Sequence, residues 1–205
     1  MILEFIFRWA HVLFGITWIG LLYYFNFVQG EYFKEAEADA KADAVKKLAP
    51  RALWWFRWGA MFTFLTGLSL LHQVGASTNI LGMPMIWMGA LAGIFMFLNV
   101  WLIIWPNQKV VLGLKEGDGP SSAAKAGLAS RTNTLFSGPM LMGMLASKHL
   151  AVGGSDTGFY AAIAIIVLLE VNAIVGKMGP MASVKGVIHC SIALTAVLGA
   201  LMMMV

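Results

Sequence analysis

Long runs of hydrophobic residues fill most of the chain and are separated by short polar segments. Each run has the roughly 20 residues that a helix needs to cross the hydrocarbon core of a bilayer. The runs are apolar almost all round, whereas the helices of a soluble protein carry a polar face. The pattern predicts membrane-spanning helices at six places, residues 5–28, 52–74, 84–105, 132–149, 157–176 and 184–205.

Composition narrows the class of protein in the same direction. Hydrophobic residues make up 60% of the 205 residues and charged residues 12%, about half the charged share of a soluble domain. The basic balance comes from loop residues, so it needs no nucleic acid to explain it. We therefore expect an all-α, polytopic transmembrane helical bundle of about six spans, in contact with the lipid bilayer and forming a single domain over residues 1–205.

The charges of the loops predict the orientation in the membrane. The first, third and fifth loops, with their flanks, carry eleven lysines and arginines, whereas the second and fourth share only Lys148. Positive loops stay in the cytoplasm, so we expect a multi-pass protein of the bacterial inner membrane with both termini outside. In the first loop, residues 29–51, Glu37–Lys41 and Asp43–Lys47 have the spacing of helical ion pairs and predict a short cytoplasmic helix ended by Pro50. The third loop, residues 106–131, is rich in glycine, proline and serine and predicts a flexible turn.

Three histidines are the main candidates for chemistry. With this topology His11, His72 and His149 all lie toward the outer side of the membrane. Two histidines on facing helices, with an apolar slot between them, can ligate a b-type haem. The alternative is that His72 and His149, which lie at span ends, are ordinary interfacial residues. We predict that His11 is a ligand of haem b iron and that His72 or His149 is the second metal ligand.

Two further features concern helix pairing. Glu170 and His189 lie at matching depth on consecutive spans, which predicts a hydrogen-bonded pair that acts as a proton relay or only locks two helices together. Gly89 and Gly93 form a GxxxG motif, which favours close helix packing either within the fold or in a dimer.

Four segments, in order, resemble one known family, the membrane-embedded N-terminal domain of bacterial cytochrome-c-linked urate oxidase (urate hydroxylase). The segments are residues 8–20 (RWAHVLFGITWIG), 55–71 (WFRWGAMFTFLTGLSLL), 99–109 (NVWLIIWPNQK) and 131–149 (RTNTLFSGPMLMGMLASKH). The residues at matching positions are His11, Asn107, Gln108, Asn133 and His149. The first segment also resembles the first helix of the membrane-bound protoporphyrinogen oxidase family, whose histidine binds haem b. The likeness is weaker beyond residue 150.

The resemblance implies a redox function. It implies a haem-b-binding electron-transfer or oxidoreductase subunit, with Asn107, Gln108 and Asn133 as structural or substrate-contacting groups. Longer members of the family continue into a c-type cytochrome domain, but these 205 residues contain no CxxCH motif. We therefore expect the electron acceptor to be another membrane or periplasmic redox protein, such as a cytochrome c, within an oligomer or larger complex.

Two other classes of protein fit the same sequence. One is a cofactor-free accessory subunit of a larger respiratory or energy-transducing membrane complex, in which the short loops and the GxxxG motif would form assembly surfaces. The other is a transporter, which is disfavoured because no clearly broken helices occur at symmetric positions.

Overall fold

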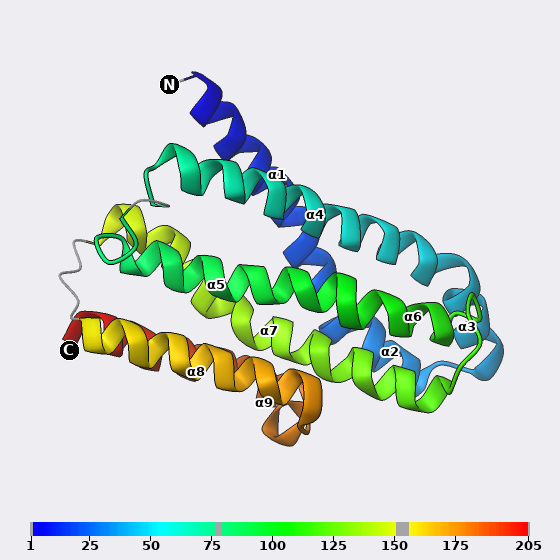
Figure 1. Cartoon of the computed structure of the whole chain (residues 1–205). Helices are drawn as coiled ribbons and strands as arrows, with labels where there is room; N and C mark the ends of the chain where they lie inside the picture. The colour runs from blue at the N-terminus through cyan, green and yellow to red at the C-terminus, as the bar shows by residue number, and fades with distance from the viewer. Residues whose placement is uncertain (1, 77–78, 151–155, 205) are drawn as a thin grey trace.

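The computed structural model describes residues 2–76, 79–150 and 156–204, and in this part of the chain helices are joined by turns without any strand (Figure 1). The first half contains α1 (Ile2–Tyr23), α2 (Gly30–Glu35), α3 (Ala38–Asp43) and α4 (Ala49–Gln73). The second half contains α5 (Pro84–Leu98), α6 (Trp105–Val111), α7 (Gly119–His149), α8 (Asp156–Val175) and α9 (Val184–Met204). The all-α helical bundle predicted from the sequence is confirmed.

Four stretches of helix are long and apolar enough to cross a membrane by length and composition, Ile2–Glu35, Pro84–Val111, Asp156–Val175 and Val184–Met203. Two other long helices, α4 with 25 residues and α7 with 31, coincide with the remaining predicted spans. They are more polar in sequence than the four. In α7 the reason is visible, because Thr132, Asn133 and Ser137 are buried inside the bundle and not turned toward lipid. The helices α8 and α9 present large apolar side chains outward, including Leu168 and Val175, as expected for contact with a bilayer.

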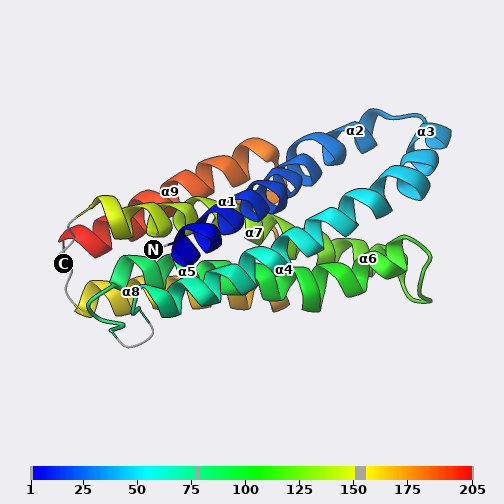
Figure 2. The same ribbon diagram turned by 90° about the horizontal axis from the view of Figure 1, so that it is seen from above.

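The helix bundle places both described ends of the chain at the same end of the molecule, opposite the turns between α2 and α3 and between α6 and α7 (Figure 2). This arrangement agrees with the alternation of loops that the charge pattern predicts. A turn with a 3-10 helix at Gly179–Ala182 joins α8 to α9.

Besides Pro139 inside α7, two prolines, Pro50 and Pro106, lie within continuous helix, and each of these two follows a π-helical turn. The π-helical turn Ala44–Leu48 joins α3 to α4 and precedes Pro50, while the turn Asn99–Ile104 joins α5 to α6 and precedes Pro106. In each case the residue before the proline donates its N–H five residues back, Ala49 to Ala44 and Trp105 to Val100. The wider turn accommodates a ring that has no N–H to give.

The predicted end of the loop helix at Pro50 is therefore wrong. The helix that begins at Ala38 continues through Pro50 to Gln73, and the real break lies at Ala36 and Glu37, whose backbones are extended. The π-helical turn before Pro50 gives its ring room and needs no N–H from it. The predicted Asp43–Lys47 ion pair is present, and a pair between Lys34 and Glu31 lies nearby at 2.8 Å.

The third loop is much shorter than its composition predicts. α6 extends to Val111 and α7 begins at Gly119, so most of residues 106–131 are helical and not a flexible turn. Asp118 caps α7, because its carboxylate accepts the backbone N–H of Ser121 at 3.3 Å. Pro120 occupies the first turn of this helix, a position that proline favours.

The GxxxG motif joins α5 to α7 within the chain. A Cβ added to Gly89 would lie 2.9 Å from the backbone oxygen of Met140 and 3.1 Å from Cα of Gly143. The two backbones therefore approach so closely at Gly89 and Gly143 that neither has room for a side chain, whereas Gly93 would meet only the side chain of Met140 at an ordinary distance. The sequence leaves two roles open for the motif, close packing within the fold or in a dimer. In the structure Gly89 packs within the fold.

Candidate functional site

A groove of about 950 Å³ runs along α1 between the helix pair α1–α4 and the helix pair α5–α7. Its walls are mostly apolar, and small residues such as Gly15, Gly67 and Gly93 leave its surface open. The volume is within the range of pockets that hold a cofactor or another small molecule. The groove contains two of the three histidines that the sequence singles out, His11 and His149.

His11 lies midway along α1, half-buried, and α4 holds its ring in place. Its Nδ1 lies 2.9 Å from the carbonyl oxygen of Thr63 and 3.1 Å from Oγ1 of Thr66. A carbonyl oxygen only accepts hydrogen bonds, so Nδ1 carries the proton and donates it. In the neutral ring Nε2 then keeps its lone pair. This is the arrangement found in metal-binding histidines, in which the non-ligating nitrogen donates to a carbonyl that fixes the tautomer and the ring.

Gly67 makes room for the His11 ring. A Cβ added there would lie 3.0 Å from Cε1 of His11, which is tighter than ordinary van der Waals contact. The hydroxyl of Thr66 lies 2.6 Å from the carbonyl oxygen of Phe62, to which it donates, so its oxygen lone pairs remain available to Nδ1 of His11. One turn of α4 thus fixes the imidazole, because Thr63 and Thr66 bind Nδ1 and Gly67 packs against Cε1.

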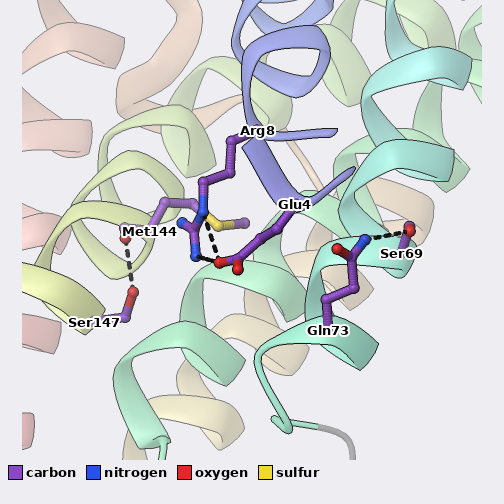
Figure 3. Close-up of polar contacts among 6 residues, drawn as sticks. All are labelled: Glu4, Arg8, Ser69, Gln73, Met144 and Ser147. Atoms are coloured by element: carbon purple, nitrogen blue, oxygen red, sulfur yellow. Dashed lines mark hydrogen bonds and ion pairs between the residues drawn. The ribbon is translucent and has the colours of Figure 1, made fainter. Parts of the chain in front are cut away.

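His149 lies at the mouth of the groove, at the last turn of α7, together with Lys148 and Arg8. Arg8 and Glu4 form an ion pair across one turn of α1, with Nη2 of Arg8 2.6 Å from Oε1 of Glu4. Figure 3 shows this pair between the ends of α4 and α7, with Ser69 and Gln73 on one side and Met144 and Ser147 on the other. The mouth is therefore polar and carries positive charge, whereas the walls are apolar.

His72 does not line the groove. It lies exposed in the last turn of α4, while its neighbours Leu71 and Val74 face the groove. The structure thus brings His11 and His149 to one cavity and leaves His72 at its edge, which favours His149 over His72 as the partner of His11.

A second polar group lies in the interior of the bundle, where α5, α7 and α8 meet. Nδ2 of Asn99 donates to Oδ1 of Asn133 at 2.9 Å and to Oε2 of Glu170 at 3.1 Å. Nδ2 of Asn133 donates to the carbonyl oxygen of Met96 at 2.9 Å. The three side chains, hereafter the Asn99–Asn133–Glu170 cluster, are all buried.

His189 lies outside this cluster. Its depth in the sequence predicts a pair with Glu170, but its side chain is exposed on α9. In the described residues the hydrogen bond to the Glu170 carboxylate comes from Asn99. A proton relay that includes His189 stays a prediction. The structure shows a different neighbour for the carboxylate, Asn99, in the π-helical turn that follows α5.

The three amides at family-matched positions lie in two places. Asn133 belongs to the buried cluster, whereas Asn107 and Gln108 lie on α6, near the opposite end from the mouth of the groove. Nδ2 of Asn107 donates to the carbonyl oxygen of Ile103 at 2.7 Å, one turn back in its own helix. Asn107 therefore has a local structural partner that supports the helix just before Pro106.

Sequence reasoning did not identify several polar residues of the groove. Thr63 and Thr66 hold His11, and deeper in the groove the hydroxyl of Tyr23 lies 2.8 Å from Oγ of Ser137. Threonine and serine are common in membrane helices, where their hydroxyls bond to the helix's own backbone, so nothing in the sequence distinguishes these.

Comparison with known proteins adds a family. The family model described as urate oxidase N-terminal matches residues 82–205. The match covers α5 to α9, including the segment after residue 150 in which the resemblance seen in the sequence is weaker. No curated protein and no solved structure matches the chain. Because the match spans more than half of the sequence, the chain belongs to the urate oxidase N-terminal family.

Proposed function

We propose that this protein is a membrane redox protein that binds haem b in the groove, with Nε2 of His11 as an axial ligand and His149 as the second. The observation that carries the proposal is the fixed ring of His11, whose Nδ1 donates to the Thr63 carbonyl at 2.9 Å and whose Nε2 is left to bind a metal. When bound, haem b would supply a carrier of single electrons. The relationship of the chain to the urate oxidase N-terminal family supports a redox role.

The residues of the groove fit such a group. No cluster of three or more His, Cys, Asp or Glu side chains that could hold a bare metal ion occurs among the described residues. A porphyrin supplies the equatorial ligands itself, so that one or two histidines suffice to hold its iron. The apolar walls suit the macrocycle, while Lys148 and Arg8 at the mouth provide positive charge for its carboxylates.

The electrons would leave through a partner at the end of the molecule where His149 lies. A cytochrome c or another redox protein outside the membrane fits this part of the proposal, as does assembly into a larger complex. The orientation follows from the loop charges, which favour the end with the α2–α3 and α6–α7 turns in the cytoplasm of a bacterial cell and both termini outside.

Reporter fusions test this orientation. Fusions after residues 40 and 120 are expected to behave as cytoplasmic, because eleven of the twelve positive residues in and beside the loops belong to that side. A phosphatase that is active only in the periplasm should remain inactive at both positions, and a fusion at the C-terminus should be active. Periplasmic activity at residue 40 or 120 would reverse the orientation and place the groove mouth in the cytoplasm.

Absorption spectroscopy tests the haem site. The purified protein is expected to show a Soret band and a sharp α band on reduction, as a six-coordinate b-type haem does. In His11→Ala and His149→Ala the iron loses one axial ligand, so the low-spin spectrum should be replaced by that of a five-coordinate haem or lost altogether. His72→Ala is the matched control, since His72 lies outside the groove, and its spectrum should equal that of the wild type.

Two outcomes would contradict the haem proposal. One is a colourless wild-type protein after expression with ample haem, and the other is a haem spectrum that does not respond to His11→Ala. Either would favour the cofactor-free accessory subunit. Gel filtration of each variant separates loss of haem from loss of the fold.

A further inference from the structure

The buried carboxyl group of Glu170 has no use in the proposed haem site. Glu170 lies on α8 with 7% of its surface exposed, and its carboxylate accepts from Asn99, which also donates to Asn133. The two asparagines lie near the midpoints of the α5–α6 helix and of α7. Asn99 and Asn133 are still more deeply buried, at 1% and 0%. Acidic residues at such a depth in membrane proteins are rare and mark functional sites, because a charge there is costly.

Among the described residues, no cation neutralises this carboxyl group. The helix from Pro84 to Ile104 carries no ionisable side chain at all. The ionisable groups on the other elements packed against α8 are Lys125, Arg131, Lys148 and His149 on α7, and Lys185, His189 and Cys190 on α9. In the described structure none of them has an ion pair or hydrogen bond with Glu170. An ionised Glu170 therefore depends on the amide of Asn99.

Asn99 offers a partner for either protonation state of the carboxyl. Its Nδ2 donates to Oε2 of Glu170, as an ionised carboxylate requires. Its Oδ1 is buried and has no hydrogen-bond partner in the described structure, so it can accept the O–H of a protonated carboxyl. A buried amide oxygen without a donor is unusual and calls for an explanation.

The surroundings fix how this amide is oriented. Asn133 donates its Nδ2 to the Met96 carbonyl, so its Oδ1 must face Asn99, and Nδ2 of Asn99 must in turn face Asn133. Asn99 is also the first residue of the π-helical turn Asn99–Ile104. Such turns often occur at functional sites, where they place a side chain that a regular helix would place elsewhere.

We propose that the Asn99–Asn133–Glu170 cluster is a proton-binding site within the membrane-embedded part of the protein. Glu170 takes one proton from water on a carboxylate oxygen, and the new O–H donates to Oδ1 of Asn99. When the proton returns to water, the carboxylate accepts from Nδ2 of Asn99, as observed. The site is independent of the haem proposal and of His189, since its three side chains carry the argument.

Infrared spectroscopy of the purified protein over a pH series tests the site. Exposed glutamates are ionised above about pH 6, so a carboxylic C=O band that persists there belongs to a buried group. We expect one such band, which shifts when the protein is labelled with 13C-glutamate and disappears as the pH is raised further. It should be absent in Glu170→Gln and unchanged in Glu35→Gln, the matched control at an exposed glutamate.

Asn99→Leu separates the proposed site from a carboxyl that is merely buried. The variant should keep the band but move it to higher frequency, because the O–H has lost its acceptor. A band that stays at the same frequency in Asn99→Leu, or that does not change over the whole pH series, would overturn the proposal. So would a band whose disappearance follows the concentration of Na⁺ at constant pH, since the site would then bind a metal cation. The 13C-labelled wild type gives the answer even if Glu170→Gln does not fold.

Discussion

Replacing Gly143 with alanine is expected to destabilise the bundle by forcing α5 away from α7. The new Cβ would lie 2.6 Å from the backbone oxygen of Met85 and 2.7 Å from Cα of Gly89. Both are backbone atoms, so no side chain can rotate out of the way and α5 would have to move off α7. Overpacking a core costs about 1–3 kcal/mol and occasionally more, and we expect Gly143→Ala to lie at or above the upper end of this range.

The matched control is Gly127→Ala on the same helix. A Cβ at Gly127 would lie 3.8 Å from Cε of Met178, an ordinary contact with the end of a flexible side chain. Because alanine favours helix over glycine by roughly 1 kcal/mol, this variant should be as stable as the wild type or slightly more stable. Unfolding in detergent, followed by tryptophan fluorescence, compares the two. Equal midpoints for Gly143→Ala and the wild type would show that α5 and α7 are not held by this contact.

This contact also illustrates what the sequence could predict about the fold. The spacing of Gly89 and Gly93 predicts a close-packing face, and the lengths of the apolar runs predict the long helices. The partner of that face could not be predicted, because Gly143 lies among methionines and leucines with no pattern to distinguish it. The errors at Pro50 and in residues 106–131 have a common cause. Proline and glycine predict helix breaks, but Pro120 occupies the first turn of α7, where proline is tolerated, and Pro50 follows a π-helical turn that accommodates its ring.

The candidate sites show a second limit, which concerns rotation about the helix axis. In a span that is apolar all round, hydropathy gives the depth of a residue but not the direction in which its side chain points. Glu170 and His189 therefore matched in depth, yet one faces the interior of the bundle and the other is exposed. His11 was a better prediction for the groove because small residues accompany it on α1 and α4. The partners Thr63 and Asn99 carry no such signal, and only the packing of the helices reveals them.

The second prediction with a large expected effect concerns Asn133, whose side chain is fully buried. Asn133→Leu removes the donor to the Met96 carbonyl and the acceptor for Nδ2 of Asn99 in one step. Each of the two groups keeps another partner, the backbone N–H of Asn99 for the Met96 carbonyl and the Glu170 carboxylate for Nδ2 of Asn99. Each lost hydrogen bond therefore costs about 0.5–1.5 kcal/mol. Leucine has as many side-chain heavy atoms as asparagine but is bulkier, so overpacking of the fully buried position would add to this loss. We expect the free energy of unfolding to fall by about 2–4 kcal/mol.

Asn172→Leu provides the control for this loss. Asn172 is also an amide on a long helix, but it lies near the end of α8, where its Nδ2 donates to the carbonyl oxygen of Lys177 at 3.2 Å in an exposed turn. Water can replace that partner, so the cost should stay below about 1 kcal/mol. If Asn133→Leu is no less stable than Asn172→Leu, the amides at the centre of the bundle do not hold α5 to α7. Asn133 is the residue that turns Nδ2 of Asn99 toward α7 and thereby sets the direction of the Asn99 oxygen. Without that constraint Oδ1 of Asn99 would lack the fixed orientation that it needs as an acceptor for Glu170.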